Sequence, residues 1–265
     1  MADRVAWVTG GSRGVGAGIA VALGSAGWHV YVTARSSGAG RTSHLPGTVE
    51  GVAGQVTQAG GTGVAVACDH RDDQAVTAVA DRIGAEHGRL DLLVNNVWAG
   101  YERLNAGAWR EWNAPMWEQP VELFDAMFGG GVRAHYVALA RCAPLLMVSA
   151  CGLVVTVSFA VPPHEQAGYG VAYGMAKSAD DRLALAAALQ LRGHGVASVA
   201  LHPGLVRTDG VMQFAEHLDL TGSQSPEGVG RAIVALADDP QVLDLTGRAI
   251  SVSELADRYQ LDVGT

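Results

Sequence analysis

The chain has 265 residues, of which 49% are apolar and 17% are charged, and its formal net charge is −8 at pH 7. This composition excludes an intrinsically disordered chain and favours a large packed core. The negative charge, without any cluster of basic residues, argues against a nucleic-acid-binding protein, because contacts to phosphates need clustered Lys and Arg.

The three cysteines, Cys68, Cys142 and Cys151, have neither the short spacing of a metal site nor that of a disulfide framework. We therefore expect a reduced, cytoplasmic protein without a metal site. The start, "MADRVAWVTGG", has too short an apolar run for a signal peptide. The charge-free stretch 142–163 is long enough for a membrane span, but its small and polar residues predict a helix end, a turn and a buried strand instead.

Short apolar runs alternate with longer helical patterns along the chain. Strands that are apolar on both faces are typical of a parallel sheet covered by helices on each side. The alternation predicts one α/β domain with a doubly wound parallel sheet. The expected strands are 5–9, 29–33, 63–67, 92–95, 153–158, 196–201 and 248–252, and the expected helices are about 15–26, 72–87, 117–148 and 171–192.

The first expected strand runs into a glycine-rich turn, "TGGSRGVG" at 9–16, just before the first helix. Glycine in such a turn allows positive φ angles and lets the backbone approach a pyrophosphate, which then lies at the helix N-terminus. A glycine-rich turn is weak evidence in a chain with 35 glycines, and it is the position after the first strand that makes this one informative.

The spacing of these glycines, T-G-x-x-x-G-x-G, resembles the motif of the short-chain dehydrogenase/reductase family. The resemblance continues in order through "CD" at 68–69, "NNVWAG" at 95–100, "YGMAK" at 173–177 and "HPGLVRT" at 202–208. It implies a Rossmann fold and an oxidoreductase that binds a nicotinamide cofactor.

The resemblance also implies how the cofactor is bound: Asp69 approaches the adenine, Asn95 and Asn96 form the floor of the site, and 203–208 holds the nicotinamide amide. The full set of implied cofactor-binding residues is Gly10, Ser12, Arg13, Gly14, Val15, Gly16, Arg35, Asp69, His70, Asn95, Asn96, Tyr173, Lys177, Pro203, Gly204, Val206 and Thr208.

The end of the second expected strand predicts NADP rather than NAD. An acidic residue there would bind the adenosine ribose of NAD, but this chain has Ala34 followed by Arg35, with Arg13 in the glycine turn. Two guanidinium groups suit the 2′-phosphate of NADP. The alternative is that Arg35 is solvated and that Arg13 only caps the turn.

Lys177 is the only lysine in the chain, and it follows Tyr173 by four residues, so both lie on one face of a helix. A phenol with a pKa near about 10 is a poor acid or base at neutral pH, and a nearby ammonium group stabilises its phenolate. The resemblance implies that Tyr173 is the proton donor and that Lys177 tunes it and binds the cofactor ribose. An ordinary surface pair is the alternative for this motif taken alone.

Two positions depart from the family pattern. Phe159 stands where the family has its substrate-orienting serine, and Ser158 is expected to replace that serine only if the strand bulges by one residue. Gly131, within the run Gly129–Gly131, stands where the family has an asparagine that supports a proton relay, so a relay would use water and backbone groups. Three glycines in mid-helix predict a kink or local unwinding.

Two segments are candidates for contact with the substrate. The insert at about 101–120 is rich in tryptophan: with Trp98 just before it, Trp109, Trp112 and Trp117 suit either a lid over an apolar substrate or internal packing and an interface. The segment at about 209–225 is expected to be a flap over the cofactor. The insert, the "GVRAHY" stretch and residues 236–259 near the C-terminus are similar to one subgroup of the family, which implies NADPH-dependent reduction of varied carbonyl compounds.

The sequence thus favours an NADP(H)-dependent oxidoreductase that interconverts a ketone, aldehyde or quinone and an alcohol, with Tyr173, Lys177 and Ser158 as catalytic candidates. A cofactor-binding sensor with little catalysis is the alternative, motivated by Phe159 and Gly131. The family resemblance also implies a homodimer or homotetramer formed through the helices at about 117–148 and 171–192.

Overall fold

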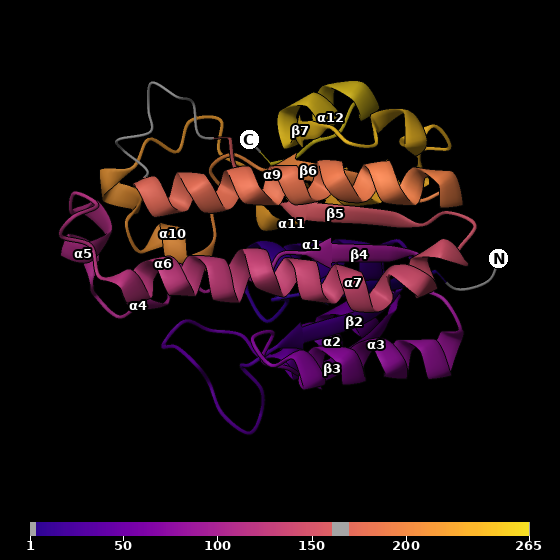
Figure 1. The fold of residues 1–265 in the computed structure, drawn as a ribbon, viewed down its shortest axis with the longest axis horizontal. Coiled ribbons are helices and arrows are strands. Elements are labelled where there is room, and N and C mark those ends of the chain that lie inside the picture. Colours follow the sequence, from indigo (N-terminus) through magenta and orange to yellow (C-terminus); the bar gives the residue numbers. More distant parts are fainter. Residues whose placement is uncertain (1–3, 161–169, 265) are drawn as a thin grey trace.

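Seven parallel strands form the centre of the protein in the order β3-β2-β1-β4-β5-β6-β7 (Figure 1). The computed structural model describes residues 4–160 and 170–264. The strands are β1 Val5–Thr9, β2 His29–Ala34, β3 Thr62–Ala67, β4 Leu92–Asn95, β5 Leu153–Val157, β6 Ala197–His202 and β7 Ala249–Ser251. All seven expected strands are confirmed to within one or two residues at their ends.

Helices cover both faces of this sheet, which confirms the predicted doubly wound α/β fold in a single domain. One face packs against α1, α2, α11 and α12, and the other against α3, α7 and α9. The main helices are α1 Gly14–Ser25, α2 Val49–Gln58, α3 Asp73–His87, α6 Val121–Met127, α7 Ala134–Met147, α9 Val171–Leu191, α11 Pro226–Asp238 and α12 Val252–Tyr259. The helices α2, α11 and α12 lie outside the segments that periodicity predicted.

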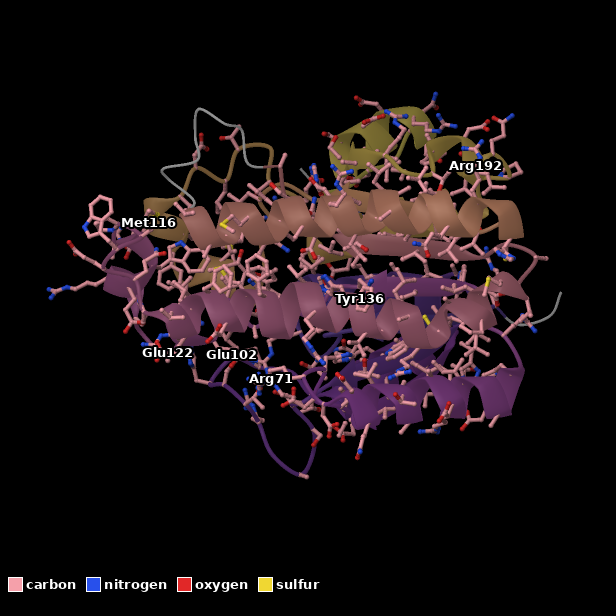
Figure 2. The ribbon with its side chains drawn as sticks, viewed as in Figure 1. Arg71, Glu102, Met116, Glu122, Tyr136 and Arg192 are labelled. Carbon is pink, nitrogen blue, oxygen red and sulfur yellow. The ribbon has the colours of Figure 1, made fainter. Side chains whose placement is uncertain are left out.

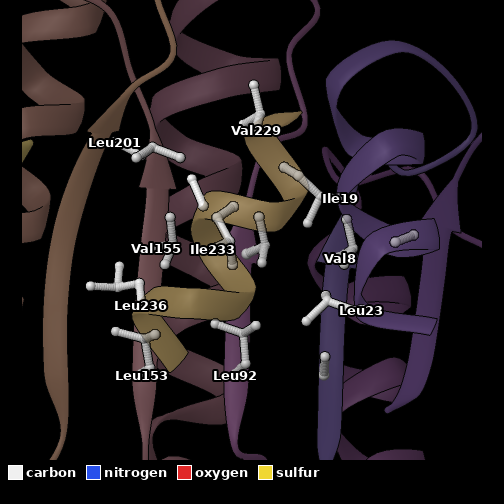
Figure 3. Packing of buried hydrophobic residues seen from close by; sticks show 14 of the residues in the cluster. Val8, Ile19, Leu23, Leu92, Leu153, Val155, Leu201, Val229, Ile233 and Leu236 are labelled. Carbon is white, nitrogen blue, oxygen red and sulfur yellow. The ribbon is translucent and has the colours of Figure 1, made fainter. Parts of the chain in front are cut away.

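The packing of α11 shows how closely the layers approach. Its apolar side chains, including Val229, Ile233 and Leu236, lie on β1, β4 and β5 beside Ile19 and Leu23 of α1 (Figure 3). Where α1 and α11 cross, a Cβ atom on Gly18 would lie 2.3 Å from the backbone carbon of Pro226. Glycine at this crossing is therefore required for the packing of the two helices.

The expected helix at 117–148 is interrupted. Between α6 and α7 the chain forms a π-helix, η1 Phe128–Arg133, in which Gly130 has non-helical angles of φ −96° and ψ 15°. This confirms the unwinding predicted from the three glycines. Single-turn π-helices of this kind often mark functional sites.

The charge-free stretch from Cys142 consists of the end of α7, a turn and the buried strand β5, as predicted; residues 161–163 lie outside the described part of the chain. Within the described ranges, no helix is long and apolar enough to cross a membrane.

Candidate active site

The predicted site residues follow the carboxyl ends of the strands. The chain proceeds outward from β1 to β3, and β4 then pairs with the other side of β1, so the sheet has a switch point between β1 and β4. Ligands of doubly wound sheets bind at such a point. The short helices α4 Glu102–Asn105, α5 Trp109–Asn113 and α10 Asp209–Met212 lie at one end of the molecule (Figure 1).

The glycine turn is built around Asn96. The side-chain amide nitrogen of Asn96 donates to the backbone carbonyls of Thr9 at 3.0 Å and Gly10 at 3.1 Å. A Cβ on Gly16 would lie 2.4 Å from that nitrogen, and Gly10 has a φ of +67°. The glycines thus allow β1, the turn and the end of β4 to meet without intervening side chains.

The first turn of α1 is open to an anion. Arg13 precedes this helix, and no side chain caps it. Uncapped N–H groups at a helix N-terminus bind phosphates. Thr208 lies next to this turn, because a Cβ on Gly14 would be 3.4 Å from the Thr208 methyl group. Two distant segments predicted to bind the cofactor, 9–16 and 203–208, are therefore neighbours.

The other predicted residues of these two segments pack inside the protein or shape the local backbone. Ser12 is buried, and Val15 packs against the main core. Pro203 follows β6, Gly204 has a φ of +69°, and Val206 is buried and bridged to Gln224. They set the path of the backbone at the edge of the candidate cofactor site.

An arginine cluster lies beside the glycine turn. Arg13 donates to the hydroxyls of Ser36 and Ser43. Burial, together with the nearby positive charges of Arg41 and Arg35, lowers the pKa of Arg13. Like charges held together in this way form a ready site for an anion.

Arg35 is not simply solvated, because it forms an ion pair with Glu102 of α4. Glu102 also acts electrostatically on Arg71, and Figure 2 shows these two side chains close to each other below the insert. Arg71 in turn binds Asp69, with a nitrogen–oxygen distance of 2.9 Å. The insert thus contacts the edge of the predicted adenine and phosphate region.

Asp69 and His70 differ in their environments. Burial opposes ionisation of Asp69, but hydrogen bonds from Arg71 outweigh it and hold the Asp69 pKa below its usual value. His70 is fully buried, which lowers its pKa to about 3, and its Nε2 lies 2.9 Å from the Thr33 hydroxyl. His70 is therefore neutral and packed behind the site, whereas Asp69 is accessible at its edge.

Tyr173 lies at the start of α9 inside an aromatic pocket. Its side chain is 5% exposed, and ring centroids of Trp98, Trp112 and Phe159 lie within 5.7–6.1 Å. The Tyr101 hydroxyl donates a hydrogen bond to the Tyr173 hydroxyl at 3.5 Å. Among the described residues, the immediate surroundings of the Tyr173 ring are therefore mainly aromatic.

Lys177 lies one turn further along α9 and is also buried. Its ammonium group donates to the Val157 carbonyl at 3.3 Å and to Asp180 at 3.2 Å. The ring of Trp98 lies 4.0 Å from the ammonium nitrogen, within the range of a cation–π contact. Trp98 thus contacts both members of the predicted catalytic pair.

Ser158 and Phe159 have distinct positions. The hydrogen bond from Ser158 N to the Leu201 carbonyl, 2.8 Å, continues the regular β5–β6 ladder, without the bulge that the sequence argument required. The Ser158 hydroxyl donates to the Lys177 carbonyl at 3.0 Å. Ser158 therefore joins β5 to α9, and the Phe159 ring packs against Tyr173.

The place of the expected asparagine is filled by Trp98. A Cβ on Gly131 would lie 2.6 Å from the Trp98 ring, and one on Gly130 would lie 2.4 Å from the Ala99 methyl group. The Gly130 carbonyl also accepts a hydrogen bond from Ala99 N at 3.1 Å. The glycine run allows the segment after β4 to pack directly against the π-helix.

The tryptophans near the insert divide into two groups. Trp98 and Trp112 pack around Tyr173, whereas Trp117 is 79% exposed; the side chain of Trp109 is outside the described set.

The predicted flap at about 209–225 contains α10. The side chain of Gln213 in it lies 3.4 Å from that of His44, in the loop after β2.

Sequence reasoning missed Tyr101, Glu102, His135 and Asp180. Tyr101 and Glu102 belong to an insert in which only tryptophan was considered. His135 belongs to the "GVRAHY" stretch, and Asp180 follows Lys177 by one helical turn, so the i, i+3 spacing was a usable signal. Among the described residues, no three His, Cys, Asp or Glu side chains form a group that could hold a metal ion.

Comparisons with known proteins agree with this geometry. The model of the short chain dehydrogenase family matches residues 4–219. Dehydrogenase/reductase SDR family member 1 is 37% identical in Mus musculus and 35% identical in Homo sapiens, and each alignment covers 98% of this chain and 83% of the relative. A crystal structure of a short chain dehydrogenase from Mycobacterium thermoresistibile has a TM-score of 0.82 and 27% identity, covering 97% of this chain and 88% of that chain.

The chain therefore belongs to the short-chain dehydrogenase family of oxidoreductases, whose members bind a nicotinamide dinucleotide. Its likeness to SDR family member 1 extends beyond the matched motifs and includes the insert and the C-terminal region. The residues present fit a dinucleotide: the glycines let the backbone of the turn pack directly against Asn96 and Val97, and no side chain caps the start of α1, whose N–H groups suit a phosphate.

Proposed function

We propose that this protein is an NADP(H)-dependent oxidoreductase that interconverts a carbonyl compound and an alcohol. The observation that carries the proposal is the Tyr173–Lys177 pair, buried on one face of α9 at the carboxyl ends of the strands. When bound, the nicotinamide dinucleotide supplies or accepts the hydride. The chain itself must bind the substrate, exclude water and move a proton.

Tyr173 is the proton donor in this proposal. Its hydroxyl is the group in the aromatic pocket that is positioned to protonate a carbonyl oxygen, and proton transfer by a placed side chain contributes about 10²–10⁴-fold in rate. Lys177 stabilises the phenolate that remains, because it is a fixed positive charge one helical turn away. In the reverse direction, Tyr173 accepts the proton of an alcohol.

The second hydrogen bond to the substrate oxygen comes from Tyr101 in this proposal, in place of the serine that is typical of the family. The Tyr101 hydroxyl already lies 3.5 Å from that of Tyr173, whereas the hydroxyl of Ser158 is engaged by the Lys177 carbonyl. Ser158 then acts by fixing α9 against β5. It is a positioning residue, not a direct partner of the substrate.

The preference for NADP rests on Arg13, Arg35 and Arg41. They lie near one another after β1 and β2, and Ser36 and Ser43 add hydroxyl donors. A 2′-phosphate would form charge-assisted hydrogen bonds with such a set. We expect Arg35 to exchange Glu102 for the phosphate, with Gly10, Gly14, Gly16, Asn95, Asn96 and Thr208 forming the rest of the site.

The substrate side of the site suits an apolar molecule. The rings of Trp98, Tyr101, Trp112 and Phe159 pack around the Tyr173 ring, so an aromatic or aliphatic ketone, aldehyde or quinone would bind against apolar surfaces. In this proposal the insert at about 101–120 is the lid over the substrate, and the segment at about 209–225 is the flap over the cofactor.

We also propose a cytoplasmic homo-oligomer. Cys68, Cys142 and Cys151 are free, as in a reducing compartment. Large apolar side chains are exposed on the outer faces of α7 and α9, including Tyr136, Met175 and Leu189 (Figure 2 labels Tyr136). Light scattering should give a dimer or tetramer, and Tyr136→Glu should shift it towards monomer; a wild-type monomer at micromolar concentration contradicts this assembly.

The test of the function is the consumption of NADPH with a panel of ketones, aldehydes and quinones, measured for the wild type and for Tyr173→Phe. We expect turnover in the wild type and a loss of at least about 100-fold in the variant, with NADPH binding retained. Tight NADPH binding without turnover of any compound would instead favour a cofactor-binding sensor.

A further inference from the structure

A chain of buried polar groups extends from Lys177 away from Tyr173. Asp180 accepts from the Lys177 ammonium group at 3.2 Å, and His135 Nδ1 lies 2.8 Å from the other oxygen of Asp180. The side chains of His135 and Asp180 are 1% and 0% exposed. The single lysine of the protein thus has a carboxylate partner that is itself held by a second buried group.

His135 is fixed from both sides. Its Nε2 lies 2.8 Å from the Val97 carbonyl, which can only accept, so this nitrogen carries a hydrogen. Its Nδ1 lies within hydrogen-bond distance of the Asp180 carboxyl group. The His135 carbonyl accepts from the Asn95 amide at 3.3 Å, which ties α7 to the end of β4. The imidazole therefore determines where the carboxylate of Asp180 lies.

The surroundings of Lys177 explain why such a partner is needed. The ring of Trp98 covers the ammonium group, and this ring occupies the space that Gly131 leaves open. Gly131 of the π-helix has no side chain that could hydrogen bond to the lysine. A buried ammonium group without a carboxylate would lose its proton more readily.

We propose that Asp180 and His135 are positioning residues that keep Lys177 charged and fix the location of its ammonium group. The proposal rests on the proposed function, because it assigns a role in Tyr173–Lys177 chemistry. Neither residue contacts the substrate in this account: Asp180 acts through Lys177, and His135 acts through Asp180.

The electrostatic directions agree with the geometry. Burial lowers the pKa of Lys177, and Asp180 is the principal group that opposes this shift, followed by Asp181. Burial alone would raise the pKa of Asp180, but His135 and Lys177 outweigh it and hold that pKa below its usual value. His70 also interacts electrostatically with His135, and it is neutral. Asp180 is thus an ionised carboxylate between Lys177 and His135.

The protein offers a direct test because Lys177 is its only lysine. Labelling with lysine carrying ¹³C at Cε gives one side-chain NMR signal, whose shift follows the protonation of the Lys177 amine without any assay of activity. The isosteric variant Asp180→Asn removes the carboxylate. Its matched control is Asp181→Asn, since Asp181 is the next acid on α9 and is bound to His202 at 2.9 Å.

We expect the midpoint of the Lys177 titration to fall by about one pH unit or more in Asp180→Asn, and by much less in Asp181→Asn. Equal midpoints in the wild type and a folded Asp180→Asn overturn the proposal. If Asp180→Asn does not fold, Asp180→Ser, whose smaller side chain leaves room for water, is read in the same way.

Activity gives an independent readout. The charged amine is the active form, so kcat/KM is lost as pH rises through the Lys177 pKa, and this alkaline limb should move to lower pH in Asp180→Asn only. A shifted NMR midpoint in a protein that turns over no carbonyl compound would leave the Asp180 assignment standing and would contradict the proposed function instead. If the NMR midpoint does not move and the enzyme is active, the Asp180 assignment is contradicted and the proposed function stands.

Discussion

Two glycine-rich segments lie near the candidate active site, the turn after β1 and the π-helix, and their glycines serve different purposes. In the turn after β1, Gly10, Gly14 and Gly16 bring backbone and Asn96 together and leave the start of α1 open, as a dinucleotide requires. In the π-helix, Gly130 and Gly131 leave space for Ala99 and Trp98 of the chain itself.

The difference teaches that the two halves of the site are under different constraints. The glycine turn, where we propose that the cofactor binds, keeps the glycine spacing typical of the family. On the proposed substrate side, Phe159 and Gly131 stand in place of the family's serine and asparagine, and aromatic rings pack around Tyr173. Lys177 is held there by Asp180 on α9, which in turn contacts His135 on α7. Substitutions in the two segments should therefore affect different properties.

Among substitutions in the two glycine-rich segments and their surroundings, the largest effect is expected for Gly16→Ala. The added Cβ would lie 2.4 Å from the Asn96 amide nitrogen and 2.5 Å from the Gly10 carbonyl, so the turn itself must shift. We expect cofactor affinity to fall by roughly 100-fold, equivalent to about 3 kcal/mol, measured by fluorescence titration with NADPH. Gly54→Ala is the control, because a Cβ at Gly54 in α2 meets open space; similar losses in both variants would refute the close-approach argument.

Gly131→Ala should act on stability and turnover more than on cofactor binding. Its Cβ would lie 2.6 Å from the Trp98 ring, and such overpacking costs about 1–3 kcal/mol in the free energy of unfolding. Gly129→Ala adds a Cβ with nothing within 4 Å and should not destabilise. Chemical denaturation of both variants measures this, and the comparison fails if Gly129→Ala is destabilised as much as Gly131→Ala.

Arg35→Asp should separate the two cofactors. Losing the guanidinium and adding a negative charge should weaken NADPH binding by about tenfold or more and leave NADH binding nearly unchanged. Glu102→Gln releases Arg35 from its ion pair and should strengthen NADPH binding slightly. An equal loss of affinity for both cofactors in Arg35→Asp would show that Arg35 does not contact the 2′-phosphate.

Tyr101→Phe is expected to have the smallest effect. It removes one neutral hydrogen bond, worth about 0.5–1.5 kcal/mol, while keeping the aromatic packing with Trp98 and Trp112. We therefore expect kcat to fall by about two- to tenfold with little change in NADPH affinity. Ser158→Ala is the matched comparison; a larger loss of kcat in Ser158→Ala, at unchanged stability, would return the substrate-binding role to Ser158.

Much of the fold and of the geometry of the glycine turn could be predicted from the sequence, because both depend on local patterns. Apolar runs gave the strands, and the glycine spacing indicated the turn that Asn96 completes. The pairing of Tyr173 with Lys177 followed from helical periodicity, and three consecutive glycines predicted the interruption that became the π-helix.

The rest depends on contacts between distant segments. Nothing local to Gly131 indicates that Trp98 fills its space, or that His135 on α7 meets Asp180 on α9. The pairing of Arg35 with Glu102 joins residues 67 positions apart. The orientation of Ser158 towards α9 followed only once the ladder from β5 to β6 was known to be regular.

The most direct test of the central claim, that this site transfers hydride with Tyr173 as proton donor, is mass spectrometry of the product formed with NADPH deuterated at both C4 positions. Carbonyl substrates found in the panel should gain one deuterium on the former carbonyl carbon with the wild type and with Tyr101→Phe, and almost none with Tyr173→Phe. Deuterium transfer by Tyr173→Phe at the wild-type rate would contradict the account.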